Sequence, residues 1–148
     1  MSDLIRQEIA IEAEPEAIFR ELLIWGQSSW WPRSSLMRFK NLSGKIDTQT
    51  LYLQKVKFPF APSWHTKNTE VSESKFYIKR CFLDGMFKGF EELLISEYSQ
   101  RSKKVAYCFN YEVNGFINKI MWKTVFKRLH INNINLVLGS LKKFLEKI

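Results

Sequence analysis

The sequence is poor in the residues that build several common kinds of functional site. Its 148 residues include only two cysteines, two histidines, four prolines and six glycines. So little proline and glycine excludes a disordered low-complexity chain or a collagen-like polymer. Cys81 and Cys108 lack the CxxC or Cys/His spacing of a metal or redox site, so we expect buried, reduced thiols.

Motifs for metal, nucleotide and covalent chemistry are also missing. His65 and His130 are far apart, and neither has a second histidine or cysteine at ligand spacing, so no metal site is predicted. The chain contains no P-loop, no dinucleotide-binding glycine pattern and no G-x-S-x-G elbow. We therefore expect no cofactor, no covalent catalysis and no nucleotide hydrolysis.

Long hydrophobic runs are absent as well. No stretch approaches the roughly 18 apolar residues of a membrane-spanning helix. The first residues lack the basic and then apolar layout of a signal peptide. A cytoplasmic protein without a transmembrane segment is expected. Its length and its 45% hydrophobic residues suit a single folded domain over residues 1–148.

Aromatic residues and positive charge are what the sequence has in excess. Twelve Phe, five Trp and five Tyr make up 15% of the chain, and each buried ring removes about 150–250 Å² from water. The formal net charge is +8. Because the basic residues are scattered, without a run of five like charges, a solvated surface is preferred to a dedicated nucleic-acid face.

The hydrophobic pattern at the start predicts a strand and then a short helix. Residues 4–12 alternate between apolar and polar, with Ile5 and Ile11 on the same side. Pro15 stands at a first helical position, and the helix should end near Leu23. Residues 25–32 contain glycine, serines and proline, so a bent, helical connector is expected there.

Strand-like segments occupy the middle of the chain. They cover residues 36–42, 50–58, 64–71, 75–83, 86–97 and 104–113. Six strands in succession indicate an antiparallel meander. Asp84 and Gly85 form a dipeptide typical of a hairpin turn between two of them.

The C-terminal stretch, residues 116–147, has no proline and predicts a long helix. Its apolar face changes along the helix. The stripe of the first half is Ile117, Ile120, Met121, Thr124 and Val125, and that of the second half is Ile134, Leu138, Leu141 and Leu145. A helix that bends near residues 130–133, or that has two burial partners, is expected.

This order of elements resembles the START-like superfamily, also called SRPBCC, which includes polyketide cyclase-like proteins. Four segments carry the resemblance: residues 9–19 with the Pro-Glu helix start, the Trp- and Pro-containing residues 25–32, residues 87–91 after the Asp-Gly turn, and residues 129–146. The resemblance implies an α+β helix-grip fold. In that fold a curved seven-stranded antiparallel sheet wraps around a long C-terminal helix, with two short helices after the first strand.

The resemblance also implies a cavity roofed by the first half of the helix. Such a cavity would bind or carry a small hydrophobic or amphipathic ligand, such as a lipid, quinone, isoprenoid or polyketide-like molecule. The expected ligand-binding residues are Trp25, Trp30, Trp31, Phe58, Phe60, Trp64, Tyr107, Phe109, Tyr111, Ile120 and Thr124. The alternative is that these rings form plain core. If all of them turn inward, a small or flat ligand is expected.

A cyclase or aromatase-type enzyme is the alternative function. Arg80, Glu91 and Tyr107, or Tyr111 in place of Tyr107, would act as acid, base and oxyanion partner if they face inward together. The simpler interpretation is that these charged residues form outward-facing cross-strand pairs. A non-enzymatic binding domain is therefore preferred.

A third hypothesis concerns a row of lysines on the C-terminal helix. Lys119, Lys123 and Lys127 are spaced at i, i+4 and i+8 and would lie on one side of about two turns. Such a row could contact the phosphates of RNA or an anionic membrane. The simpler interpretation is the solvated back of an amphipathic helix.

Overall fold

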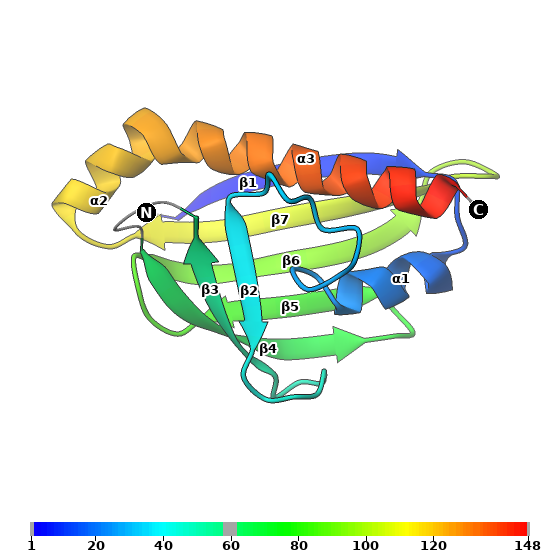
Figure 1. Cartoon of the computed structure of the whole chain (residues 1–148), viewed down its shortest axis with the longest axis horizontal. Coiled ribbons are helices and arrows are strands. Elements are labelled where there is room, and N and C mark those ends of the chain that lie inside the picture. The colour runs from blue at the N-terminus through cyan, green and yellow to red at the C-terminus, as the bar shows by residue number, and fades with distance from the viewer. Residues whose placement is uncertain (1, 58–61, 148) are drawn as a thin grey trace.

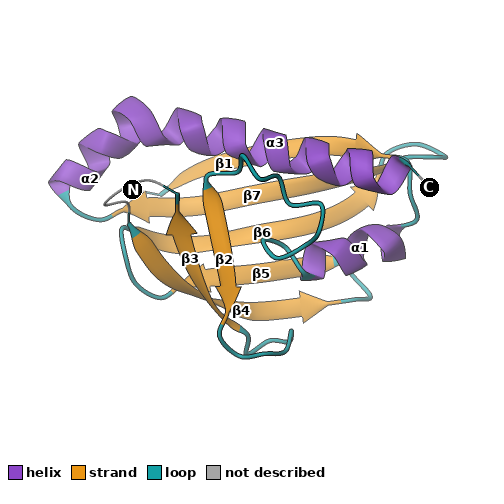
Figure 2. Cartoon of the chain, viewed as in Figure 1, coloured by secondary structure: helices purple, strands orange, loops and turns teal. Residues whose placement is uncertain are grey.

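The computed structural model describes residues 2–57 and 62–147. Within these residues a seven-stranded antiparallel sheet curls around a long C-terminal helical segment (Figures 1 and 2). The elements are β1 (Asp3–Ile11), α1 (Pro15–Leu23), β2 (Met37–Asn41), β3 (Leu51–Val56), β4 (Ser63–Ser72), β5 (Tyr77–Phe82), β6 (Phe87–Glu97), β7 (Lys103–Val113), α2 (Phe116–Met121), η1 (Trp122–Phe126) and α3 (Lys127–Glu146). The predicted α+β arrangement is confirmed.

The strand order shows how the meander closes. The sheet runs β1-β7-β6-β5-β4-β3-β2, so each strand from β2 to β7 pairs with its sequence neighbour. The first strand instead pairs with the last, from Asp3 opposite Tyr111 to Ile11 opposite Lys103. The turn expected at Asp84 joins β5 to β6. The predicted boundaries of the six successive strands agree with those of the structure to within two residues.

Two irregularities accompany the curvature of the sheet. A bulge shifts the pairing of β4 with β5 between Asn68 and Glu70, and bulges bend the strand that carries them. In β6, Gly89 has a φ of +128°, and a Cβ there would lie 2.0 Å from the backbone oxygen of Asn110 in β7. Only glycine permits this conformation and this close approach of two strands.

The connector between α1 and β2 forms a series of turns, and the second short helix predicted for it is absent from the described chain. Gly26 explains the difference, because its φ is +88° and a Cβ would lie 2.3 Å from the ring of Phe39. Trp25, Trp30 and Trp31 pack against one another in this connector, with ring centroids 5.1–6.3 Å apart. The three tryptophans thus form part of the core.

The long C-terminal helix is confirmed, but its irregularity lies earlier than residues 130–133. A π-helical turn, η1, separates α2 from α3. The wider turn adds one residue, so that Trp122 points inward and is buried. The predicted stripe of the first half points outward: Ile117 is 71% exposed and Val125 is 52% exposed. The first half of the helix does reach the interior, as the resemblance implied, but through Trp122 and Phe126 and not through this stripe. The α2 helix itself extends past the end of the sheet (Figure 1).

Two glycine-to-alanine substitutions should have opposite effects on stability. Gly89→Ala should lower the free energy of unfolding by about 2 kcal/mol or more. The alanine would have to adopt a positive φ, and its Cβ would clash with the backbone of Asn110. Gly139→Ala should raise it by about 1 kcal/mol, because that glycine lies inside α3 with no atom close to the added Cβ. Urea unfolding measures both, and equal effects would contradict this account of the curvature.

Candidate functional site

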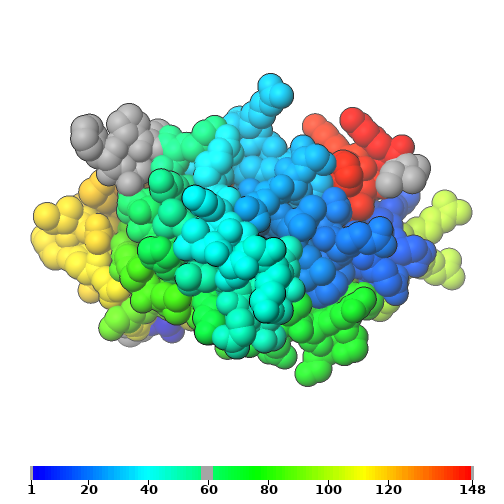
Figure 3. All heavy atoms as spheres, turned by 60° about the horizontal axis from the view of Figure 1, so that its bottom comes forward, coloured from blue at the N-terminus to red at the C-terminus, as the bar shows by residue number. Residues whose placement is uncertain are grey.

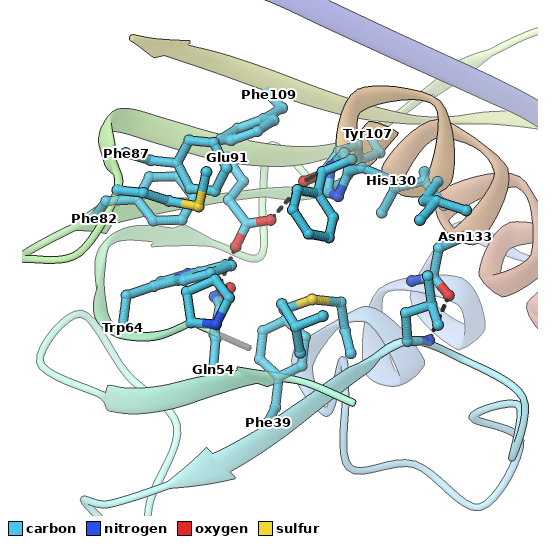
Figure 4. A pocket seen from close by; sticks show the side chains of 18 of the residues that line it. Phe39, Gln54, Trp64, Phe82, Phe87, Glu91, Tyr107, Phe109, His130 and Asn133 are labelled. Carbon is cyan, nitrogen blue, oxygen red and sulfur yellow. Dashed lines mark hydrogen bonds between the residues drawn. The ribbon is translucent and has the colours of Figure 1, made fainter. Parts of the chain in front are cut away.

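A cavity lies between the concave face of the sheet, the connector and the inner side of η1 and α3. The space that the centre of a water molecule can reach inside it is about 60 Å³. Its wall is mostly aromatic, with rings from Trp25, Trp31, Phe39, Trp64, Phe82, Phe87, Tyr107, Phe109, Trp122 and Phe126. Polar atoms enter the wall at few points, chiefly from Gln54, Glu91, Tyr107, His130 and Asn133 (Figure 4).

Several of the residues predicted to bind ligand line this cavity. They are Trp25, Trp31, Trp64, Tyr107 and Phe109. Trp30 and Tyr111 are buried beside the cavity and are not part of its wall. The Tyr111 hydroxyl is occupied, since it donates to Asp3 (3.0 Å) and accepts from Trp122 Nε1 (2.9 Å).

The remaining predicted residues do not reach the cavity or cannot be placed. Ile120 and Thr124 are exposed on the outer side of the helix, so their predicted ligand contacts are wrong. The cause is the π-turn, which directs Trp122 and Phe126 inward instead. Phe58 and Phe60 lie outside the described residues.

The three candidate catalytic residues come together inside the sheet. Arg80 on β5 is directly opposite Glu91 on β6, and Tyr107 follows on β7. All three are buried, so the outward-facing alternative is wrong. Arg80 Nη1 lies 3.5 Å from Glu91 Oε1, and the Tyr107 hydroxyl donates to Glu91 Oε2 at 2.7 Å. Both partners of Glu91, Arg80 and Tyr107, are donors, and a buried carboxylate needs donors around it.

A glutamine and a tryptophan complete the surroundings of this carboxylate. Gln54 on β3 donates from Nε2 to Glu91 Oε1 at 2.9 Å. The Gln54 oxygen in turn accepts from Trp64 Nε1 at 3.0 Å. Because Trp64 can only donate, this bond fixes which end of the Gln54 amide faces Glu91. Gln54 was missed in the sequence, where no pattern distinguished it from a surface glutamine.

Arg80 balances the charge of Glu91 from behind the cavity wall. Its Nε donates to Asn68 at 3.2 Å, and its guanidinium lies over the ring of Tyr52, 4.5 Å from the centroid. It does not line the cavity. A buried ion pair of this kind is stable only when its remaining polar atoms are also bonded. The carboxylate of Glu91 therefore lines the cavity, and the guanidinium of Arg80 does not.

His130 on α3 adds a further polar side chain next to Tyr107. Its Nε2 lies 3.2 Å from the Tyr107 hydroxyl. Because that hydroxyl donates its own proton to Glu91, His130 acts as the donor here, with its proton on Nε2. Burial among Phe109 and Trp122 lowers the pKa of His130 to about 4, although the charge of Glu91 opposes the shift. His130 is therefore neutral at pH 7.

Tyr107 holds its proton firmly. Burial raises the pKa of its hydroxyl well above the ordinary value, and the neighbouring charge of Glu91 raises it further. The result is a row of hydrogen-bonding groups, from His130 through Tyr107 to Glu91, in which His130 is neutral and Tyr107 keeps its proton near neutral pH. His130 was not among the predicted ligand-binding or catalytic residues. Its position four residues before Ile134, in the predicted apolar stripe, was the available signal that it faces inward.

Asn133 supplies the cavity with an unused donor. Its Oδ1 accepts from the backbone N–H of Leu36 at 2.8 Å. Its Nδ2 is buried and has no hydrogen-bond partner among the described residues. Figure 4 shows this nitrogen directed toward the open space of the cavity. A buried donor without a partner costs about 1–3 kcal/mol, so a ligand acceptor at this point would be favoured.

Within residues 2–57 and 62–147, no three His, Cys, Asp or Glu side chains gather as a metal site would require. In the same part of the chain, no helix has the length and hydrophobicity needed to cross a membrane.

The fold has counterparts among solved structures, although no model of a known protein family and no curated protein sequence matches the chain. Norcoclaurine synthase from Thalictrum flavum, solved with dopamine and hydroxybenzaldehyde, has a TM-score of 0.74 at 12% identity, covering 99% of this chain and 88% of that one. An aromatase/cyclase from a Streptomyces species has a TM-score of 0.75 at 10% identity, covering 97% and 95%.

A START superfamily protein from Mycobacterium smegmatis is also similar, with a TM-score of 0.71 at 14% identity and coverage of 97% of both chains. Identities this low establish the fold and not the activity. The chain therefore has the START-like, helix-grip fold that its sequence resembles.

The half-buried His130 should make stability fall in mild acid. Its pKa is about 4 in the folded protein and about 6.5 when unfolded, so its neutral form stabilises the fold above pH 6.5. This contribution is lost as the pH falls from about 6.5 to 4, and the loss reaches about 3 kcal/mol. Urea unfolding of wild type and His130→Gln across this range should show a shallower pH dependence in the variant. Identical slopes would contradict the assignment.

Proposed function

We propose that the cavity binds a small, uncharged, largely aromatic molecule that carries a carbonyl-type oxygen. The observation that supports this most directly is the Asn133 amide nitrogen, a buried donor facing a ring-lined space without a partner. A ligand oxygen would accept from this nitrogen, while rings of the wall would stack on the body of the ligand.

The size and charge of the cavity narrow the ligand further. Ten aromatic side chains reach the wall and leave little open space, so a flat ring system of quinone or polyketide-like type suits it better than a whole phospholipid. Glu91 contributes its carboxylate to the wall, whereas Arg80 lies behind it. An anionic ligand would be repelled, and a ligand hydroxyl would be a favourable donor toward Glu91. The small aromatic molecules solved with norcoclaurine synthase are in keeping with this choice.

A binding screen tests the proposal. Quinones, aromatic ketones, isoprenoids and fatty acids are added to the purified protein, and melting temperature and native mass spectra are recorded. Aromatic ketones or quinones should raise the melting temperature, and fatty acids should not. If no apolar compound binds, the proposal is wrong.

A substitution at Asn133 tests the role of its amide. Asn133→Asp keeps an oxygen for the Leu36 N–H but removes the donor, so affinity for a bound ketone should fall about tenfold, as expected for one hydrogen bond. Asn132→Asp makes the same change of charge at the exposed neighbouring position and serves as the control. Equal affinities of the two variants would show that Asn133 does not contact the ligand.

General acid–base catalysis is the second candidate function, and a specific arrangement favours it. Glu91 can accept a proton from a ligand, while Tyr107 donates to its carboxylate and His130 donates to Tyr107. Two proteins of similar fold are named as a synthase and an aromatase/cyclase. Removal of a proton next to a ketone carbonyl is the reaction that this group would promote, with Glu91 as base.

Deuterium exchange distinguishes binding from catalysis. A ketone from the screen is incubated with the protein in D₂O, and loss of the proton signal beside its carbonyl is followed by NMR. Acid–base catalysis predicts faster exchange than in buffer, with the acceleration lost in Glu91→Gln and kept in Glu92→Gln, whose side chain bonds Tyr77 instead. Binding of the ketone without any acceleration would leave a carrier and remove the enzyme hypothesis.

A further inference from the structure

An apolar stripe on the outside of the C-terminal helix has no partner among residues 2–57 and 62–147. It consists of Phe116, Ile117, Ile120, Met121 and Val125, which are all exposed, with Phe116 at 77% and Ile117 at 71%. Five large apolar side chains within ten residues form a patch, and such patches on proteins mark interaction sites. Figure 3 shows the α2 region, in yellow, at one extremity of the molecule.

The stripe is neither core nor cavity wall. The inner side of the same segment is held by Trp122, whose ring packs against Phe87 and whose Nε1 donates to Tyr111. The stripe faces the opposite way, and α2 lies beyond the end of the sheet (Figure 1). These side chains therefore contribute little to folding, and their hydrophobicity requires another explanation.

Positive charge flanks the stripe. Lys119 and Lys123 are exposed along one side of the helix, and Lys127 continues the row while contacting Asp3 at 3.2 Å. Asp3 and Glu112 are the carboxylates on this side. Together with the formal charge of +8, the row gives this end of the molecule a basic border next to an apolar surface.

We propose that the α2–η1 segment docks on an anionic lipid bilayer. A helix that carries an apolar face and flanking lysines lies in the plane of the membrane interface, with its apolar side chains among the acyl chains and its ammonium groups near lipid phosphates. RNA would use the lysines alone and would leave the exposed rings and branched chains unexplained. The bilayer accounts for both features with the same segment.

The location of the segment connects this surface to the cavity. Trp122 and Phe126 belong to the same helical stretch as the stripe and line the cavity from its inner side. A bilayer bound to the outer side would lie one helix diameter from the cavity. This proposal does not depend on which ligand the cavity takes, and it stands if the cavity proves to bind none.

Vesicle co-sedimentation tests the proposal with the whole chain. Phosphatidylcholine vesicles with and without phosphatidylglycerol are used at low and high salt. The protein should sediment with the anionic vesicles at low salt, and much less with phosphatidylcholine alone or at high salt. Absence of sedimentation with anionic vesicles at low salt would overturn the proposal.

Two variants and their controls separate the contributions. Ile117→Ser with Ile120→Ser should reduce anionic-vesicle binding about tenfold or more, whereas Leu42→Ser with Leu83→Ser, at exposed sites elsewhere, should not. Lys119, Lys123 and Lys127 all changed to Glu should abolish binding, whereas the same change at Lys40, Lys55 and Lys75 should leave most of it. Circular dichroism confirms that each variant is folded.

An RNA arm decides between the two classes of partner. A single-stranded RNA is titrated into the wild type and both helix variants. The membrane proposal is overturned if two results occur together: RNA binding depends on the lysines but not on Ile117 and Ile120, and vesicle binding is also unaffected by the isoleucine substitutions. The surface would then be assigned to nucleic acid.

Discussion

The buried carboxylate of Glu91 is the constraint around which the interior is arranged. A charge inside a protein is tolerated only when donors surround it, and its partners come from β3, β5 and β7 as Gln54, Arg80 and Tyr107. These strands must keep their register for all three contacts to exist. The same contacts hold the side chains of the cavity wall in place, so the stability of the sheet and the geometry of the site depend on one group.

Aromatic packing determines how strongly this polar group acts. The ring of Phe87 lies 5.0 Å from the rings of Phe109 and Trp122 and 5.2 Å from that of Trp64, measured between centroids. Such surroundings exclude water and strengthen every hydrogen bond within them. They also make an unused donor such as Asn133 Nδ2 costly, which is why the ligand we propose is apolar except at one or two atoms.

The order of the elements could be predicted from the sequence, whereas the directions of particular side chains could not. Alternation identified the first strand, and three of the predicted ligand-binding residues on β7 are buried: Tyr107, Phe109 and Tyr111. Arg80 lies between Ile78 and Phe82 on the inward face of β5. The period of the strand could have placed it there, but the general tendency of charged residues to face water suggested the opposite. The π-turn left no mark in the sequence, and a regular helical period therefore assigned Ile120 to the cavity instead of Trp122.

The pairing of β1 with β7 has a consequence for how the chain folds during its synthesis. Asp3 lies opposite Tyr111, so β1 leaves the ribosome roughly a hundred residues before its partner, an interval of about 5–20 s at ordinary translation rates. During that time the apolar side chains of Ile5 and Ile11 have no sheet to join. The helix that covers the sheet is made later still. The domain therefore reaches its native contacts only after nearly all of the described chain has been synthesised.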